Sequence, residues 1–137
     1  MSQKTRVIIA GGRDFNIMVL VEIAMMETFE CNYTEIELVG GGANGADALG
    51  KRFAKEHGIP YKEFPADWGT YHNAAGPIRN RQMARYATET GFRGILIAFW
   101  DGKSRGTKHM IDTATELGME VKVIAYGAGT RMETVIK

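Results

Sequence analysis

Three glycine-rich segments carry the residues whose types and spacing suit chemistry on a phosphate-bearing ligand. The longest is the run Gly-Gly-Gly-Ala-Asn-Gly-Ala-Asp from Gly40 to Asp47, which follows an apolar strand-like run and opens a helix-like run. Glycines let backbone N–H groups approach a ligand closely, and the N-terminus of the helix behind them carries partial positive charge. The run therefore favours the binding of phosphate or another anion. The alternative is a tight turn in which Asn44 caps the helix and no ligand binds.

Two further segments have the same character. They are Gly11-Gly12-Arg13-Asp14-Phe15 and Asp101-Gly102-Lys103-Ser104-Arg105-Gly106-Thr107. Arg13 can pair with phosphate and Asp14 can accept from ribose hydroxyls, and the alternative is a solvated arginine beside a helix-capping aspartate. Ser104 and Thr107 offer hydroxyls at a helix start, where ordinary N-capping is the alternative. Three such turns, each between a strand and a helix, predict one composite nucleotide site.

Side chains outside these turns add to the expected site. Trp68 and Tyr71 lie in a long loop where an aromatic ring could stack on a base or fill a small satellite core. Arg79 falls in the first turn of the next helix, near the expected strand ends, whereas Arg81 and Arg85 are expected on a solvated face. The residues expected to contact the ligand are Gly11, Gly12, Arg13, Asp14, Gly41, Gly42, Asn44, Gly45, Asp47, Trp68, Arg79, Asn80, Asp101, Ser104, Gly106 and Thr107.

The elements that must position these residues alternate along the chain. Apolar runs predict strands at 6–10, 35–39, 61–64, 94–100 and 120–125, and helices at 16–30, 46–57, 77–90 and 106–117. We therefore predict a single α/β domain over 1–137, a Rossmann-like doubly wound fold with a mostly parallel five-stranded sheet and helices on both faces. Ligands bind such sheets beyond the carboxyl ends of the strands, which is where all three glycine segments fall.

Composition narrows the function further. The 137 residues have a formal net charge of +1, which gives no global attraction to nucleic acid or anionic membranes. Cys31 is the single cysteine, and we see no signal-type or membrane-spanning segment, so we expect a cytoplasmic protein. The histidines His57, His72 and His109 are scattered, so we expect no zinc-type metal site and no required cofactor beside a nucleotide-like ligand.

The helix expected at 16–30 is apolar almost all round. Its inward face toward the sheet should comprise Ile17, Leu20, Val21, Ala24 and Thr28. The other faces carry Met18, Val19, Ile23, Met25, Met26 and Phe29. A helix of this kind is usually buried on more than one side, which predicts a homodimer or higher oligomer. The alternative is a methionine-rich surface of no consequence.

In this order, the motifs resemble the SLOG superfamily, and specifically its YspA/cpYpsA-related branch found in bacteria and their phages. The segments that carry the resemblance are Gly11 to Phe15, Gly41 to Asp47, Ala66-Asp67-Trp68, Ala75 to Met83 and Phe99 to Thr107. The resemblance implies a Rossmann-like fold that binds a nucleotide or nucleotide-derived ligand, often as a dimer.

The same superfamily contains the LOG enzymes, which cleave nucleoside monophosphates to a base and ribose 5-phosphate. The segment from Arg79 to Met83 resembles their Arg-Lys-x-x-Met motif, so the resemblance gives Arg79 the role of its arginine. The segment from Ser104 to Met110 resembles their Gly-Gly-x-Gly-Thr-x-x-Glu motif, with Met110 in place of the glutamate. A methionine cannot transfer a proton or stabilise an oxocarbenium-like centre, which argues against hydrolysis of the LOG type.

Three hypotheses follow for the function. The first is the binding of an ADP-ribose-like ligand or a nucleoside phosphate, by a sensor or a sequestering protein. The second is a LOG-like phosphoribohydrolase that uses Asp14, Asp47 or Asp101 as its carboxylate. The third is the binding of single-stranded nucleic acid, as in the related DprA proteins, and the near-neutral charge makes this unfavourable.

Overall fold

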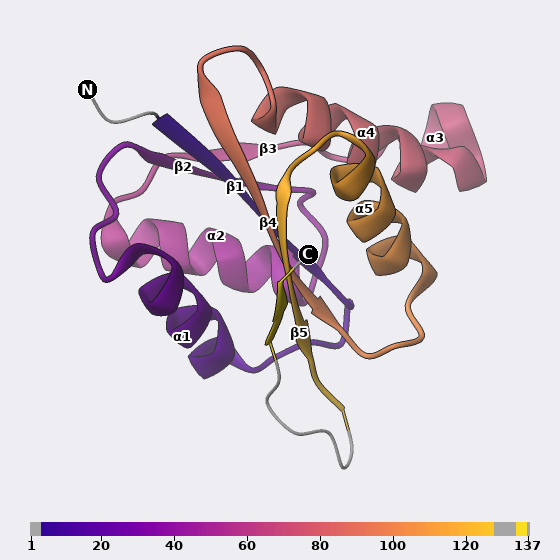
Figure 1. Cartoon of the computed structure of the whole chain (residues 1–137). Coiled ribbons are helices and arrows are strands. Elements are labelled where there is room, and N and C mark those ends of the chain that lie inside the picture. The colour runs from indigo at the N-terminus through magenta and orange to yellow at the C-terminus, as the bar shows by residue number, and fades with distance from the viewer. Residues whose placement is uncertain (1–3, 128–133, 137) are drawn as a thin grey trace.

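In a computed structural model of the chain, which describes residues 4–127 and 134–136, strands and helices alternate as the sequence predicts (Figure 1). The elements are β1 (Lys4–Gly11), α1 (Met18–Phe29), β2 (Ile36–Gly40), α2 (Ala46–His57), β3 (Tyr61–Glu63), α3 (Trp68–Tyr71), the 3₁₀ helix η1 (His72–Ala74), α4 (Ala75–Ala87), β4 (Phe92–Trp100), α5 (Arg105–Glu116), β5 (Glu120–Ala125) and β6 (Thr134–Ile136).

The strand order β3-β2-β1-β4-β5-β6 defines a doubly wound sheet. Strands β1 to β5 are parallel, which confirms the predicted fold class. The chain builds the sheet outward in one direction from β1 and then in the other from β4, so the strand order reverses between these two strands. Crevices that bind ligands form at such a reversal.

The sixth strand was not predicted from the sequence. Strand β6 pairs antiparallel with β5 at the edge of the sheet. Its three residues, Thr134–Ile136, are too few to establish a strand period. The segment at 128–133, part of the tail that follows Tyr126, lies outside the described residues.

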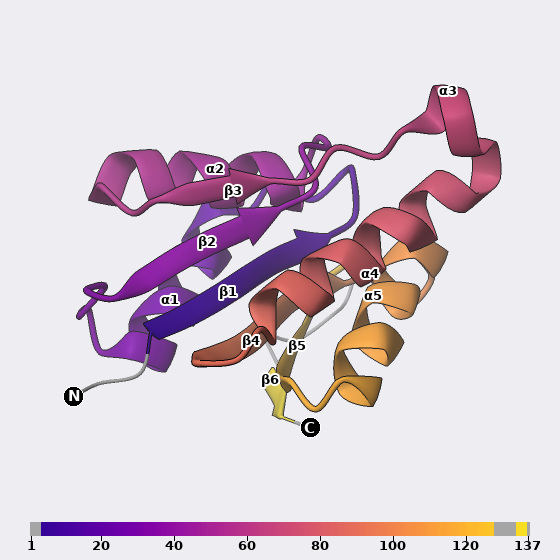
Figure 2. The ribbon, with the colours of Figure 1, turned by 90° about the horizontal axis from the view of Figure 1, so that it is seen from above.

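The helices form two layers around the sheet. Figure 2 shows α1 and α2 on one face and α4 and α5 on the other. Neighbouring residues of β1 serve opposite layers, because Val7 and Ile9 join the core beneath α1 and α2, whereas Ile8 and Ala10 join the core beneath α4 and α5. This burial on both faces explains why the central strands are continuous apolar runs rather than alternating ones.

Helix α1 is rotated slightly from the face that the sequence predicted. Leu20, Val21 and Ala24 are buried as expected. Met25, expected on an outer face, is also fully buried, whereas Ile17, expected to face inward, is 37% exposed. Ile17 comes just before the first residue of α1, so its side chain does not follow the helical periodicity that was used to place it.

The loop predicted before the third long helix contains two short helical elements, α3 and η1. The side chain of Asp67 accepts a hydrogen bond from the backbone N–H of Thr70, 3.1 Å away, which caps α3. Helix α4 then starts at Ala75, before Pro77, and ends at Ala87. No apolar periodicity marks α3, because none of its four residues is buried.

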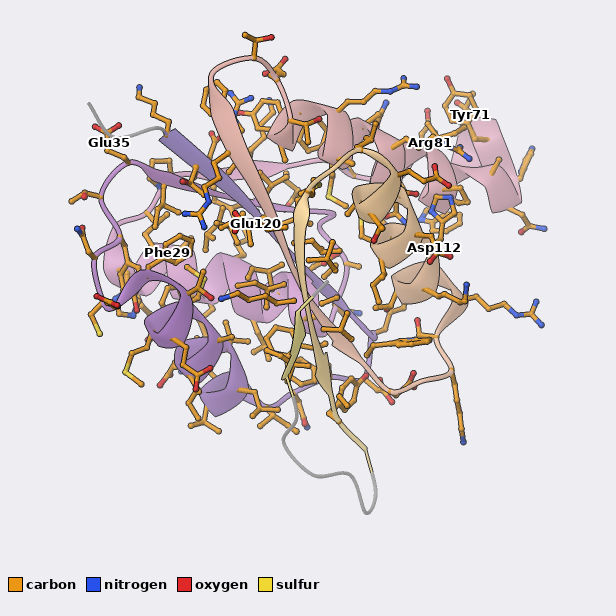
Figure 3. The ribbon with its side chains drawn as sticks, viewed as in Figure 1. Phe29, Glu35, Tyr71, Arg81, Asp112 and Glu120 are labelled. Atoms are coloured by element: carbon orange, nitrogen blue, oxygen red, sulfur yellow. The ribbon has the colours of Figure 1, made fainter. Side chains whose placement is uncertain are left out.

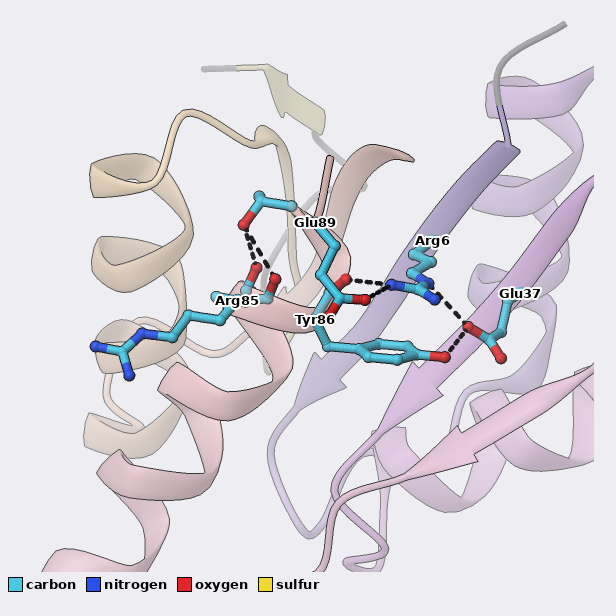
Figure 4. A network of polar contacts seen from close by, with 7 residues as sticks. Arg6, Glu37, Arg85, Tyr86 and Glu89 are labelled. Atoms are coloured by element: carbon cyan, nitrogen blue, oxygen red, sulfur yellow. Dashed lines mark hydrogen bonds and ion pairs between the residues drawn. The ribbon is translucent and has the colours of Figure 1, made fainter. Parts of the chain in front are cut away.

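A polar network fastens α4 to the end of the sheet where β1 and β2 begin (Figure 4). The Arg6 guanidinium donates from Nε to Glu37 Oε1 at 3.1 Å, and from Nη1 to the backbone oxygen of Tyr86 at 2.6 Å and to Glu89. Its Cζ atom lies 3.6 Å from the ring centroid of Tyr86 and 3.5 Å from that of Phe92. The Arg6 side chain is only 11% exposed, so these partners replace most of its contact with water.

Replacing Arg6 should therefore destabilise the protein more than replacing an exposed arginine on the same sheet. We expect Arg6→Ala to lower the free energy of unfolding by about 2–3 kcal/mol, because it leaves the partly buried Glu37 carboxylate without its cation. Arg93→Ala, which removes an exposed ion pair with Glu120, should cost less than about 1 kcal/mol. Urea denaturation measures both changes, and equal losses would contradict the structural role of Arg6.

Candidate functional site

The three glycine segments meet at the carboxyl edge of the sheet. They form loop 1 (residues 11–15), loop 2 (residues 40–47) and loop 3 (residues 101–107). Loops 1 and 2 touch directly, because the N–H of Ala46 donates to the backbone oxygen of Gly12 at 3.3 Å. A Cβ atom on Gly45 would lie 2.1 Å from that same oxygen, and Gly45 has a φ of +76°. Glycine is therefore needed at this position for the two loops to approach each other.

The loops surround a main cavity of about 740 Å³, a volume typical of a small-molecule site. It is lined by loops 1 and 3, the first turns of α4 and α5, and parts of loop 2 and α3. A side cavity of about 270 Å³ adjoins it beside loop 2. The residues that line both cavities are Arg13, Ala43, Trp68 and Arg79.

All but one of the predicted contact residues line one of these cavities. The main cavity takes Gly11, Gly12, Arg13, Asp14, Asp47, Trp68, Arg79, Asn80, Asp101, Ser104, Gly106 and Thr107, and the side cavity adds Gly41, Gly42 and Asn44. Gly45 lines neither and packs against loop 1. Tyr71 also lines neither cavity, and Figure 3 shows it at the outer end of the segment formed by α3 and α4. Of the two aromatic rings considered as a cover for a base, Trp68 is the one at the cavity.

Arg79 links α4 to loop 2. Its Nη1 donates to the backbone oxygen of Gly41 at 2.9 Å, and its Nε donates to Asn80 Oδ1 at 3.2 Å. A Cβ atom on Gly41 would lie 1.9 Å from Nη1, so the guanidinium packs directly on the glycine backbone. Burial lowers the pKa of Arg79, and the nearby Asp47 carboxylate opposes that effect. The side chain nevertheless remains a cation at any physiological pH.

Asp47 is a buried carboxylate at the start of α2, 8% exposed. Burial raises its pKa, whereas hydrogen bonds from the backbone of Ala43 and Gly41 and the charge of Arg79 oppose the rise. The N–H of Ala43 donates to Asp47 Oδ2 at 3.1 Å, which folds loop 2 back on the helix that follows it. Asp47 therefore shapes the loop and also supplies a negative group beside Arg79.

Asn80 continues the polar chain toward α5. Its side chain is 5% exposed. Its Nδ2 donates to the backbone oxygen of Gly106 at 3.3 Å and lies 3.1 Å from Nδ1 of His109. Burial lowers the pKa of His109. His109 is not among the predicted site residues, although it follows Thr107 by only two positions.

Several polar groups of loop 3 form hydrogen bonds with one another and hold the shape of the loop. Asp101 Oδ1 accepts from the N–H groups of Lys103 and Ser104, each at 2.8 Å, and these bonds lower the pKa of Asp101. Ser104 Oγ accepts from the N–H of Thr107 at 3.4 Å, as a helix cap. The capping interpretation is therefore correct for Ser104. Asn44, by contrast, does not cap α2, whose N-cap is Gly45.

Charge at the cavity is set by arginines and helix ends. The Cζ atom of Arg13 lies 5.8 Å from the ring centroid of Trp68, at the junction of the two cavities. The first turns of α2, α4 and α5 all contribute residues to the lining of the main cavity. Asp14 is held at the rim by the Tyr126 hydroxyl, which donates to Oδ1 at 3.1 Å. Burial and this carboxylate raise the pKa of Tyr126 to about 12.

Comparison with known proteins identifies the family of the chain. The family model described as the YspA, cpYpsA-related SLOG family matches residues 5–71. The gene 61 protein of Mycobacterium phage D29 is 30% identical over 127 residues, which cover 89% of this chain and 96% of that protein. The chain therefore belongs to the YspA, cpYpsA-related SLOG family, as its motifs indicate. No solved structure gives a significant match.

Residues 4–127 and 134–136 show neither a membrane-spanning helix nor a cluster of metal ligands. No helix in this part of the chain is long and apolar enough to cross a membrane. Within the same residues, no group of three or more His, Cys, Asp or Glu side chains is placed to hold a metal ion.

The contact between loops 1 and 2 makes a prediction about two glycines. Gly45→Ala should lower the free energy of unfolding by about 2 kcal/mol or more, because the new methyl group meets the Gly12 backbone at a positive φ. Gly106→Ala has open space around the added methyl group and lies in the first turn of α5, so it should leave stability unchanged or raise it. Thermal and urea denaturation of the two variants test this, and equal stabilities would show that the loops do not need their close approach.

Proposed function

We propose that the protein binds a nucleotide or nucleotide-derived ligand, of the nucleoside phosphate or ADP-ribose type, and acts as a sensor or sequestering protein that needs no further cofactor. The observation that supports this most is the convergence of loops 1, 2 and 3 with Arg13 and Arg79 around one cavity of about 740 Å³. Membership of the SLOG family points to a nucleotide-related ligand.

The phosphate groups belong beside loop 2 in this proposal. Gly41 and Gly42 line the side cavity, and Arg13 and Arg79 line both cavities. The Nε and Nη1 atoms of Arg79 donate to protein acceptors. Among the described residues, its Nη2 has no hydrogen-bond partner. A diphosphate at this junction would place one end of the ligand in each cavity, which favours an ADP-ribose-like ligand over a monophosphate.

Hydrolysis of the LOG type is a weaker candidate. Met110 lines the main cavity and is 1% exposed, so the residue at the glutamate position faces the ligand without an ionisable group. The carboxylates among the described lining residues are Asp14, Asp47 and Asp101. Asp101 accepts two backbone N–H groups and Asp47 holds loop 2, so both already have structural roles. Release of adenine during incubation with AMP or NAD would replace the binding proposal with an enzymatic one.

The binding of single-stranded nucleic acid is the least favoured function. Proteins that track a phosphate backbone carry a clear basic surface, and this chain has a net charge of +1. We expect no change in the fluorescence anisotropy of labelled oligonucleotides at micromolar protein.

Arg13 gives the sharpest test of the ligand-binding proposal. Arg13→Ala should weaken the binding of AMP and ADP-ribose about tenfold, because it removes one charge-assisted contact from an exposed side chain. Arg52→Ala is the matched control, since Arg52 is exposed on α2 and pairs with Glu56. Isothermal titration calorimetry measures both, after native mass spectrometry has identified any nucleotide carried through purification. Equal affinities in wild type and Arg13→Ala would contradict the assignment of loop 1.

We also propose that the protein is a homodimer through α1. Val19 is 55% exposed and Met26 is 46% exposed, and with Ile17 they leave apolar surface on the helix beyond the face that packs on the sheet. Surface of this kind is usually covered by a partner.

A charge placed on this surface should disrupt such a dimer. We expect Val19→Glu and Met26→Glu to convert a dimer into a folded monomer, as measured by analytical ultracentrifugation. Leu117→Glu is the control, because Leu117 is 42% exposed at the end of α5, away from α1. A monomeric wild type, or dissociation by the control as well, would contradict the α1 interface.

A further inference from the structure

The orientation of the Asn80 amide is fixed by its partners. Its Oδ1 must face Nε of Arg79, a donor 3.2 Å away, and its Nδ2 must face the backbone oxygen of Gly106, an acceptor 3.3 Å away. Reversing the amide would set a donor against a donor and an acceptor against an acceptor. Asn80 is also 5% exposed, so water cannot compensate for such a reversal.

This amide in turn fixes the protonation of His109. Asn80 Nδ2, which can only donate, lies 3.1 Å from His109 Nδ1, so Nδ1 must be the acceptor of this bond. The proton of the neutral imidazole is then on Nε2. A second proton, on Nδ1, would point at the amide N–H groups and would break the bond.

The charged groups around His109 act in both directions. Burial and Arg81, on the facing helix α4, lower the pKa of His109, whereas Asp112 and Glu116 on its own helix raise it. The lowering prevails, so the imidazole is neutral at pH 7. Among the described residues, its Nε2 has no hydrogen-bond partner, although His109 lines the main cavity.

Two buried methionines line the main cavity on α4 and α5, the two helices that carry Asn80 and His109. Met110 follows His109 in the chain and Met83 lies one turn along α4 from Asn80, and both line the cavity while being almost fully buried. A cavity wall that holds an uncharged donor and two thioethers suits a flat group with apolar faces and acceptor atoms on its edge. It suits phosphate poorly, because phosphate takes charged donors.

We propose that His109 is a specificity-determining residue, whose fixed Nε2–H donates to an acceptor on the edge of a nucleobase held over Met83 and Met110. This inference rests on the proposed function, since it assumes that the cavity holds a nucleotide. It assigns the base to His109, Met83 and Met110, in a cavity whose wall also carries Arg13, Arg79 and Arg105.

The protonation state is measurable without any ligand. Long-range ¹H–¹⁵N NMR of the whole protein should find His109 protonated on Nε2 and bare on Nδ1, with a pKa below the ordinary 6.5. In Asn80→Asp the new carboxylate would accept from Nδ1, so the proton should move to Nδ1 and the pKa should rise. A wild-type ring with its proton on Nδ1, or a pKa of 6.5 or higher, would overturn the inference and leave the proposed function intact.

Paired ligands test the contact with the base. AMP and ribose 5-phosphate share the phosphate and the sugar, and only AMP carries the base. His109→Leu should raise the ratio of the AMP Kd to the ribose 5-phosphate Kd about tenfold, the effect of one lost hydrogen bond. His109→Gln, whose amide can place an N–H near the Nε2 position, should raise the ratio less. His57→Leu, on the exposed end of α2, should leave the ratio as in wild type.

The outcomes separate the two proposals. Normal AMP binding with an unchanged ratio in His109→Leu would overturn the role of His109 alone. Absence of AMP and ADP-ribose binding to the wild-type protein would overturn the proposed function and this inference together. If His109→Leu does not fold, the ratio in His109→Gln and the NMR result on the wild type still decide the question.

Discussion

A single polar chain joins the two halves of the sheet across the crevice between β1 and β4. It runs from the backbone oxygen of Gly41 through Arg79 and Asn80 to the backbone oxygen of Gly106. A doubly wound fold opens a gap where its strand order reverses, and loops on either side of such a gap have few contacts with each other. Here α4 supplies two adjacent side chains that reach loop 2 and α5, so the width of the cavity is set before a ligand arrives.

Burial makes the pKa values of Arg79 and Asp47 depend on each other's charge. Arg79 loses water and keeps its positive charge, which is tolerable because it lies beside the Asp47 carboxylate and a backbone oxygen. Burial raises the pKa of Asp47 in turn, and that cation and the backbone N–H groups of loop 2 oppose the rise. Each side chain therefore affects the pKa of the other, and among the described residues Nη2 of Arg79 has no hydrogen-bond partner. The opposite end of the sheet holds a separate network around Arg6, so stability there does not compete with ligand binding.

The sequence predicted the fold and most of the cavity because both follow from local patterns. The range 46–57 was predicted as observed, since glycine marks both ends of α2, and the position of the loops at the carboxyl edge follows from parallel pairing. Contacts between residues far apart in the chain leave no such local pattern in the sequence. Gly45 is a glycine because loop 1 touches it, and His109 faces the cavity because Asn80 holds it. Strand β6 depends on pairing with β5, which three residues do not signal.

The position of Met110 in the cavity shows what the replacement of the LOG-type glutamate removes from the site. Met110 lies in the wall of the main cavity and is nearly inaccessible to water, so no proton donor or acceptor stands at that position. The carboxylates that line the main cavity already accept hydrogen bonds within the protein: Asp101 from Lys103 and Ser104, Asp47 from Ala43, and Asp14 from Tyr126. The arginines and amides that suit phosphate are kept, whereas the group that would cleave the glycosidic bond is absent from its expected place. This combination favours a site that holds a nucleotide intact.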